Sequence, residues 1–135
     1  MKKILCLVSL LIMSATLAIA SDVSPQSVKG AKTVDTSEAK KLFDSGVIFI
    51  DTRKNSDWEA GRVSDAVHLD LKSNFTEKTL SAEVGKGDPL VCYCNGEKCM
   101  RSSVCSTKAV EWGFTNTYYY RDGFPAWKTA GHPVE

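Results

Sequence analysis

In Leu90-Val-Cys-Tyr-Cys-Asn-Gly-Glu-Lys-Cys-Met-Arg-Ser-Ser103, an apolar run leads into a short polar loop and then into a segment of helical character. The run from Leu90 to Tyr93 has no alternation of apolar and polar residues, which is typical of a strand buried on both faces of a parallel sheet. Asp88-Pro89 precedes this strand, and Gly96 lies in the loop that follows it. The stretch therefore predicts a strand, a tight loop and a helix in succession.

Strand-like and helix-like segments alternate through the rest of the chain. Val47–Ile50 is a second apolar run of strand length, and Thr36 or Ser37 is suited to cap the helix before it. The predicted strands cover 33–35, 47–50, 66–69, 90–93 and 117–120, and the predicted helices cover 36–43, 55–60, one turn near Leu80, 100–112 and a short segment from 123. This alternation predicts a single α/β domain over 33–135, with a central, mostly parallel five-stranded sheet flanked by helices in three layers.

Residues 1–20 have the pattern of a secretory signal peptide. A lysine pair supplies a positive start, an uncharged and mostly apolar run follows, and Ala18-Ile19-Ala20 fits a small-residue cleavage site. The alternative is a membrane anchor, which needs roughly 18 or more apolar residues, and this run is shorter. We therefore expect cleavage after Ala20, loss of Cys6 with the peptide, and a periplasmic or secreted protein with no membrane attachment. Residues 21–32 are polar and are expected to form a flexible N-terminal lead-in.

The charge of the chain is close to balanced, with 17 Lys and Arg against 16 Asp and Glu. Nucleic-acid-binding domains usually carry a pronounced excess of basic side chains, and attraction to anionic membranes also requires one. We therefore expect neither nucleic acid nor a membrane surface as a partner.

Four of the five cysteines lie close together, at Cys92, Cys94, Cys99 and Cys105. A chain of this length buries enough surface to fold without covalent cross-links. A disulfide framework would spread its cysteines along the chain, because cross-links that close long loops stabilise most in the chain-entropy model. The tight spacing therefore indicates a functional site.

Cys94 stands at the end of the predicted strand, and ligands of open α/β sheets bind beyond the carboxyl ends of strands. The backbone N–H groups of the loop from Asn95 to Cys99, with those of the helix start that follows, can turn toward one point and form a cradle for an anion. Such a cradle would hold Cys94 as a thiolate without a histidine base. His68 and His132 are expected to be structural or exposed.

Three segments resemble the rhodanese family of single-domain thiosulfate sulfurtransferases. Asp51-Thr-Arg-Lys-Asn-Ser-Asp-Trp-Glu-Ala-Gly-Arg-Val-Ser-Asp-Ala-Val-His-Leu69 is similar to the family's D-x-R signature and the F/W-x-x-G-H-I-x-x-A pattern after it. Val91-Cys-Tyr-Cys94 and its glycine-containing loop are similar to the active-site strand and loop. Gly123-Phe-Pro-Ala-Trp-Lys-Thr-Ala-Gly-His-Pro-Val-Glu135 is similar to the closing G-G-x-x-A-W-x-x-A-G-x-P-V pattern. The three segments occur in the family's order.

The resemblance implies a rhodanese-like α/β domain and a two-step sulfur transfer with Cys94 as the nucleophile. Its thiolate would take the outer sulfur of thiosulfate or a similar donor, release sulfite and hold a persulfide, which a thiol, cyanide or a protein sulfur acceptor would then discharge. The residues implied to surround the donor and the persulfide are Asn95, Gly96, Glu97, Lys98, Cys99, Met100 and Arg101, with positive charge from Lys98 and Arg101. No cofactor and no metal are implied.

The loop departs from the family pattern at Cys99, which stands where the common loop has Arg, five positions after the nucleophile. Arg101 follows two positions later, so the loop has no arginine at the position where the family usually has one. Cys99 is therefore either a redox partner, which would attack a Cys94 persulfide or form a disulfide with Cys94, or a small residue that packs under the helix start. Cys92 and Cys105 are expected to be buried structural residues.

Asp51 and Arg53 form a further charged pair directly after the second predicted strand. We expect them to tie the strand end to neighbouring loops through hydrogen bonds and an ion pair. Their predicted role is structural, near the site.

Four other functions match parts of this pattern. A phosphatase or arsenate reductase needs arginine after five residues, whereas six separate Cys94 from Arg101. A zinc protein would pair its ligands at two to four intervening residues, which the cysteine spacing does not match. A non-catalytic binding module would be expected to lack the nucleophile. A thiol–disulfide or persulfide-relay protein that uses Cys94 and Cys99 is the main alternative.

Overall fold

A computed structural model of the chain describes residues 23–135, so the predicted signal peptide, its cleavage site and Cys6 lie outside the described residues. The helices are α1 (Thr36–Asp44), α2 (Asn55–Ala60), α3 (Glu77–Glu83), α4 (Arg101–Glu111) and α5 (Gly123–Thr129). The strands are β1 (Lys32–Thr33), β2 (Ile48–Asp51), β3 (Val67–His68), β4 (Pro89–Tyr93) and β5 (Asn116–Tyr120). Strands and helices alternate as predicted, and none of the helices in this part of the chain is long and apolar enough to cross a membrane.

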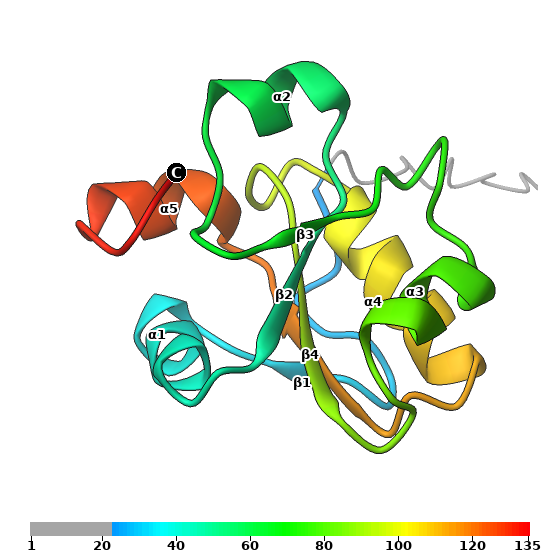
Figure 1. The fold of residues 1–135 in the computed structure, drawn as a ribbon. Coiled ribbons are helices and arrows are strands. Elements are labelled where there is room, and N and C mark those ends of the chain that lie inside the picture. Colours follow the sequence, from blue (N-terminus) through cyan, green and yellow to red (C-terminus); the bar gives the residue numbers. More distant parts are fainter. Residues whose placement is uncertain (1–22) are drawn as a thin grey trace, which may run out of the picture.

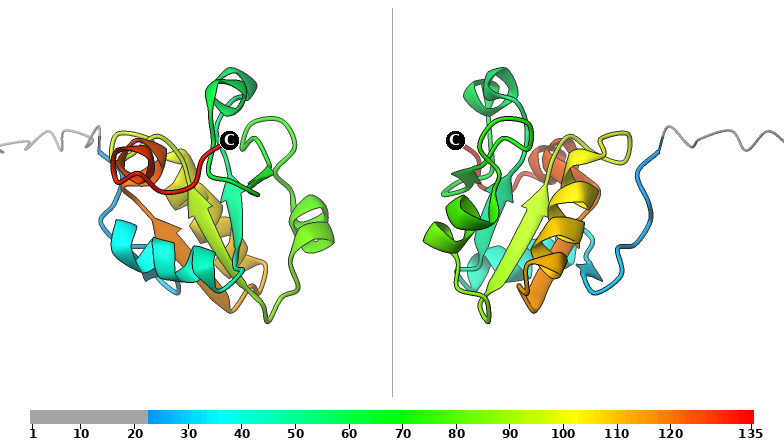
Figure 2. Two further views of the ribbon diagram at one scale, coloured as in Figure 1. Left: turned by 60° about the vertical axis from the view of Figure 1, so that its left-hand side comes forward. Right: turned by 90° about the vertical axis from the view of Figure 1, so that its right-hand side faces the viewer.

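The strands form one five-stranded sheet in the order β1-β5-β4-β2-β3, and every pair in it is parallel. β4 is central, since Cys92 pairs with Tyr119 of β5 on one side and with Ile50 of β2 on the other. Helices cover both faces of the sheet (Figures 1 and 2), which confirms the predicted three-layer α/β fold. Because all strands run the same way, their carboxyl ends share one edge, and the loops after β2, β4 and β5 meet there.

The central strand contributes side chains to two separate apolar clusters. Leu90 and Cys92 belong to the cluster that includes residues of α3 and α4, whereas Val91 and Tyr93 belong to the one that contains Trp127 of α5. All four strand residues are fully buried. This burial on both faces explains why apolar and polar residues do not alternate in β4. The strand ends at Tyr93, so Cys94 is the first residue beyond it.

Helix α1 begins with a reciprocal capping box formed by Asp35 and Glu38. The Glu38 N–H donates to the Asp35 carboxylate at 2.8 Å, and the Asp35 N–H donates to the Glu38 carboxylate at 3.3 Å. The prediction that Thr36 or Ser37 caps this helix is therefore wrong. The predicted strand 33–35 also ends early, at Thr33, because Asp35 already caps the helix.

The segment before β1, predicted to be a flexible lead-in, contacts the domain at several points. Ser24 is buried, and its N–H and hydroxyl groups both donate to the Glu97 carbonyl at 2.7 Å. The Tyr119 hydroxyl donates to the Pro25 carbonyl at 2.7 Å, and Arg121 donates to the Ser24 carbonyl at 3.0 Å. These contacts attach the segment to the loop that follows β4 and to the end of β5.

Candidate active site

Cys94 directly follows β4 at the carboxyl edge of the sheet, and it is fully buried. Its carbonyl accepts a hydrogen bond from the Phe124 N–H at 2.8 Å. Only glycine fits at Gly123, because its φ is +69° and a Cβ there would overlap the Cys94 carbonyl and lie 2.7 Å from the Gly96 nitrogen. The first turn of α5 therefore packs directly on the backbone of Cys94 and its loop.

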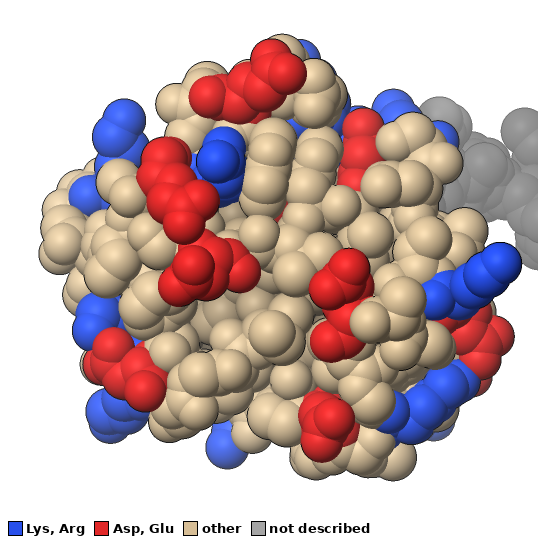
Figure 3. All heavy atoms as spheres, in the orientation of Figure 1, with Lys and Arg blue, Asp and Glu red and all other residues tan. Residues whose placement is uncertain are grey.

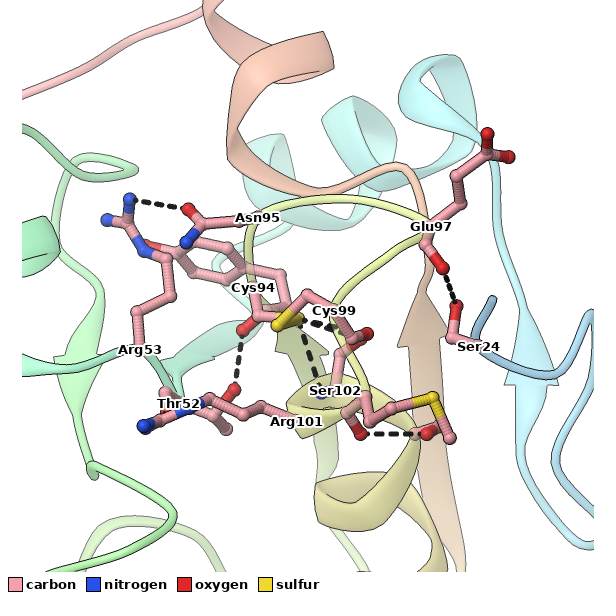
Figure 4. The surroundings of a disulfide bond; sticks show 12 residues. Ser24, Thr52, Arg53, Cys94, Asn95, Glu97, Cys99, Arg101 and Ser102 are labelled. Carbon is pink, nitrogen blue, oxygen red and sulfur yellow. Dashed lines mark hydrogen bonds between the residues drawn. A yellow bond between two sulfur atoms is a disulfide. The ribbon is translucent and has the colours of Figure 1, made fainter. Parts of the chain in front are cut away.

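The Cys94 sulfur is surrounded by polar atoms of Ser102 and Cys99. It lies 3.3 Å from the hydroxyl oxygen and 3.4 Å from the backbone nitrogen of Ser102, and 3.5 Å from the Cys99 carbonyl oxygen (Figure 4). Ser102 is fully buried in the first turn of α4, where backbone N–H groups have no partner within the helix. Its N–H and hydroxyl groups, together with the positive end of the helix, favour negative charge on the sulfur.

We expected N–H groups of the loop from Asn95 to Cys99 and of the following helix start to surround the sulfur, but Ser102 itself was not singled out in the sequence. In the described part of the chain, the helix start supplies these donors through Ser102, and the expected loop amides do not contact the sulfur. The two adjacent serines after Arg101 were a signal that could have been used, because small hydroxyl residues are common at helix starts.

The structure joins Cys94 to Cys99 by a disulfide, with Cα atoms 6.5 Å apart (Figure 4). The loop between them turns tightly, since the Cys99 N–H donates to the Gly96 carbonyl at 3.0 Å and Gly96 has a φ of +115°. Cys94 is fully buried, whereas Cys99 is partly exposed. This is the arrangement that a redox partner of Cys94 requires, and a Cys94 thiolate can form only when the disulfide is reduced.

A second disulfide joins Cys92 of β4 to Cys105 of α4, with Cα atoms 6.1 Å apart. Both residues are fully buried in the apolar cluster between the sheet and α4, in accordance with the structural role expected for them. The tight spacing, which we took to indicate a site rather than a disulfide framework, is therefore misleading for Cys92 and Cys105. It misleads because the strand and the helix that follows it pack side by side, which brings residues 13 positions apart into contact.

The remaining loop residues form the outer rim of the site. The Glu97 carboxylate lies 3.4 Å from Arg121, while Lys98 and Met100 are exposed. A hollow of about 410 Å³ lies between this loop and α5, lined by 95–98, Asp122, Pro125 and Ala126. The hollow carries charges of both signs.

Arg101 points away from the loop toward neighbouring elements. Its Nη1 donates to the Thr52 carbonyl at 2.8 Å and to the Asp70 carboxylate at 2.7 Å. Burial disfavours the ionised carboxylate, but hydrogen bonds from the Lys72 N–H and from Arg101 outweigh it and hold the pKa of Asp70 below its usual range. The positive charge of Arg101 is therefore neutralised locally. Acidic and basic side chains are both spread over the face shown in Figure 3.

Asp51 and Arg53 form a buried ion pair, with Nη2 and Oδ2 2.8 Å apart. The Tyr93 hydroxyl donates to the same carboxylate at 2.6 Å, and burial together with the Asp51 charge raises the pKa of Tyr93 above its usual range. Arg53 also donates to the Asn95 side chain at 3.3 Å, and Asn95 donates to Asp57 at 2.9 Å. The pair thus links the end of β2 to the first residue of the loop after Cys94, as Figure 4 shows for Arg53 and Asn95.

The two histidines make packing contacts. His68 stacks on Trp58 with ring centroids 4.7 Å apart, and its Nε2 lies 2.7 Å from the Arg53 carbonyl oxygen. His132 packs edge-on against Trp127 at 4.9 Å. Within residues 23–135, no group of three or more His, Cys, Asp or Glu side chains is arranged to hold a metal ion.

Comparison with known proteins gives one consistent family. The model of the rhodanese-like domain matches residues 35–130. The chain is 28% identical over 104 residues to the thiosulfate sulfurtransferase GlpE of Pseudomonas syringae, which covers 77% of this chain and 92% of that relative.

Two solved structures share the fold. The BH2092 protein from Bacillus halodurans has a TM-score of 0.68 at 18% identity, over 78% of this chain and 77% of that one. The human single-domain sulfurtransferase TSTD1 has a TM-score of 0.62 at 21% identity, over 73% and 96% of the two chains. Because the family match runs from the cap of α1 through the Cys94 loop to the end of α5, the chain belongs to the rhodanese-like domain family.

Proposed function

We propose that the protein is a sulfurtransferase that accepts the outer sulfur of thiosulfate or a similar anionic donor on Cys94 and passes it to a thiol or to cyanide. The observation that carries the proposal is the setting of the Cys94 sulfur, which lies 3.3 and 3.4 Å from the hydroxyl and backbone nitrogen of Ser102. In a rhodanese-like domain, a sulfur held in this way is suited to act as a nucleophile. The similarity to a thiosulfate sulfurtransferase supports the donor class.

The reaction begins once the Cys94–Cys99 disulfide has been reduced. The Cys94 thiolate attacks the outer sulfur of thiosulfate, the sulfur–sulfur bond of the donor breaks, and sulfite leaves with the bonding electron pair. The product on the protein is a Cys94 persulfide. In the second step cyanide or a thiolate attacks the outer sulfur of the persulfide, and Cys94 leaves as a thiolate stabilised by Ser102.

The charges around the site suit a small anionic donor that binds weakly and whose sulfite leaves after it has given up its sulfur. Arg101 is held by Asp70, so it contributes little net charge to the loop. The remaining attraction comes from the N-terminal end of α4 and from Lys98, which is exposed on the loop. We therefore expect weak, salt-sensitive binding of thiosulfate.

The disulfide between Cys94 and Cys99 supports a second candidate function, a thiol–disulfide relay. A relay would alternate between the dithiol and the disulfide and exchange electrons with a protein partner. It would never carry a sulfane sulfur, and this difference separates it from the first proposal.

The decisive experiment compares the wild type with Cys94→Ser and Cys99→Ser after mild reduction. Thiocyanate production from thiosulfate and cyanide is measured, and intact mass is recorded after thiosulfate alone. We expect a gain of one sulfur atom, about 32 Da, in Cys99→Ser and none in Cys94→Ser. If Cys94→Ser keeps the adduct, the nucleophile is misassigned. If no variant gains sulfur or forms thiocyanate, the relay becomes the better function.

We also propose that the protein is exported to the periplasm or secreted. The signal-peptide pattern of residues 1–20 supports this location, and so do two disulfides, which persist in oxidising compartments. The test is the mass of the mature chain in isolated cell fractions. Export predicts a chain that begins at Ser21 in the periplasmic or external fraction, and an uncleaved chain in the cytosol would contradict it.

A further inference from the structure

We propose that Cys99 is a resolving cysteine that discharges the Cys94 persulfide within the same chain, releases hydrosulfide and leaves the Cys94–Cys99 disulfide. This inference rests on the proposed loading of sulfur onto Cys94. The protein would then reduce the sulfane sulfur of its donor to hydrosulfide, with a dithiol as the source of electrons.

The loop places Cys99 against the inner sulfur of the expected persulfide, which is the Cys94 sulfur itself. The two sulfur atoms are bonded in the structure, and the turn between Gly96 and Cys99 holds them there without an external partner. Cys99 also occupies the position five residues after the nucleophile, and the nearby Arg101 is engaged with Thr52 and Asp70. The loop therefore places a thiol, rather than a guanidinium group, beside the Cys94 sulfur.

Burial decides which sulfur each nucleophile can attack. Cys94 is fully buried between Ser102 and Cys99, so an acceptor from solvent has access to the outer sulfur of a persulfide rather than to the inner one. Cys99 is already beside the inner sulfur. Attack there forms the Cys94–Cys99 bond and breaks the bond between the inner and outer sulfurs.

The step balances within the protein. The Cys99 thiol loses its proton, its sulfur bonds to the Cys94 sulfur, and the outer sulfur leaves with the bonding electron pair and takes up the proton as hydrosulfide. The two cysteines are oxidised to a disulfide, and the sulfane sulfur is reduced. No further reagent is needed until the disulfide must be opened.

The disulfide is built to be opened from the Cys99 side. Cys99 is partly exposed and Cys94 is not, so a dithiol reductant attacks the Cys99 sulfur. Cys94 then leaves as a thiolate, for which Ser102 provides an N–H and a hydroxyl group. Reduction therefore regenerates the nucleophile in its reactive form.

A single-turnover experiment without any free thiol tests the proposal. The full mature chain is reduced with an immobilised phosphine, separated from it, and mixed with one equivalent of thiosulfate. We expect the wild type to release about one sulfite and one hydrosulfide per chain and to lose about 2 Da as the disulfide forms. We expect Cys99→Ser to release the same sulfite, release no hydrosulfide and retain about 32 Da.

A titration with dithiothreitol provides the matched control. Hydrosulfide release from Cys99→Ser should rise in proportion to dithiothreitol, because one thiol of this dithiol takes the outer sulfur of the persulfide and the other then closes a cyclic disulfide and releases hydrosulfide. The first turnover of the wild type should not depend on dithiothreitol. Retention of the persulfide by the wild type, or equal hydrosulfide release by Cys99→Ser without thiol, would overturn the resolving role. Absence of sulfite from both proteins would instead refute the proposed sulfur loading.

Discussion

Removal of the Cys92–Cys105 disulfide should cost the protein a defined part of its stability. The bond closes a loop over a sequence separation of 13, for which the chain-entropy model gives about 3 kcal/mol at room temperature. Both cysteines are fully buried in the cluster between β4 and α4, so replacement by alanine also leaves small voids. We therefore expect Cys92→Ala/Cys105→Ala to lose at least about 3 kcal/mol in its free energy of unfolding, which corresponds to roughly 10–15 °C in Tm.

The assay is urea unfolding followed by tryptophan fluorescence, with both proteins carrying Cys94→Ser and Cys99→Ser so that the second cross-link contributes nothing. The parent with the intact Cys92–Cys105 bond is the matched control. When it is unfolded in the presence of a reductant, its free energy of unfolding should fall toward that of the protein with Cys92→Ala and Cys105→Ala. A difference under about 1 kcal/mol would refute the reasoning, since it would mean that the bond neither restricts the unfolded chain nor supports the core.

Three further predictions address the site and its supports. Ser102→Ala removes a hydroxyl that lies 3.3 Å from the Cys94 sulfur but keeps the backbone N–H. Single-turnover sulfite release should therefore slow about tenfold, as expected for the loss of one hydrogen bond to a charged group. An unchanged rate would exclude the hydroxyl from the reaction. Asp70 has a pKa below its usual range, so its ionised form stabilises the fold at neutral pH and this contribution is lost as the pH falls below about 4. Denaturant unfolding should therefore show that the difference in free energy of unfolding between the wild type and Asp70→Asn becomes smaller as the pH falls. A larger difference at acidic pH would contradict a stabilising ion pair between Asp70 and Arg101. Ser24→Ala removes one of two hydrogen bonds to the Glu97 carbonyl and should speed amide hydrogen exchange in the loop after β4 by up to about tenfold, with no comparable change in α3.

The position of Cys94 could be predicted from the sequence because it follows from the pattern of one strand. An apolar run without alternation predicted burial on both faces, and the structure places Leu90 and Val91 in opposite clusters of the core. Such a strand has little freedom in register, so the residue after it must lie at the carboxyl edge of the sheet. That reasoning located Cys94 without any knowledge of its partners.

The partners themselves depend on contacts that the local sequence does not encode. Ser102 reaches the sulfur only because α4 begins at Arg101, and helix boundaries shift easily by a residue or two. Arg101 turns toward Asp70, which comes from a separate segment beyond β3. The prediction of the N-cap of α1 was wrong for a related reason. Asp35 and Thr36 are both acceptable N-cap residues, and the reciprocal hydrogen bonds between Asp35 and Glu38 decide between them.

The two disulfides lie next to each other in the chain but differ in the access that a thiol exchange reaction needs. Exchange requires a thiolate to approach one sulfur of the bond, which the partly exposed Cys99 allows and the fully buried Cys92 and Cys105 do not. The Cys94–Cys99 bond can therefore open while the neighbouring bond still fastens α4 to β4. This matters because Ser102 stays beside the Cys94 sulfur only if the start of α4 does not move when the loop is released. The buried disulfide thus keeps the donors that favour the thiolate in place when the Cys94–Cys99 bond is reduced, which is the state that the proposed reaction requires.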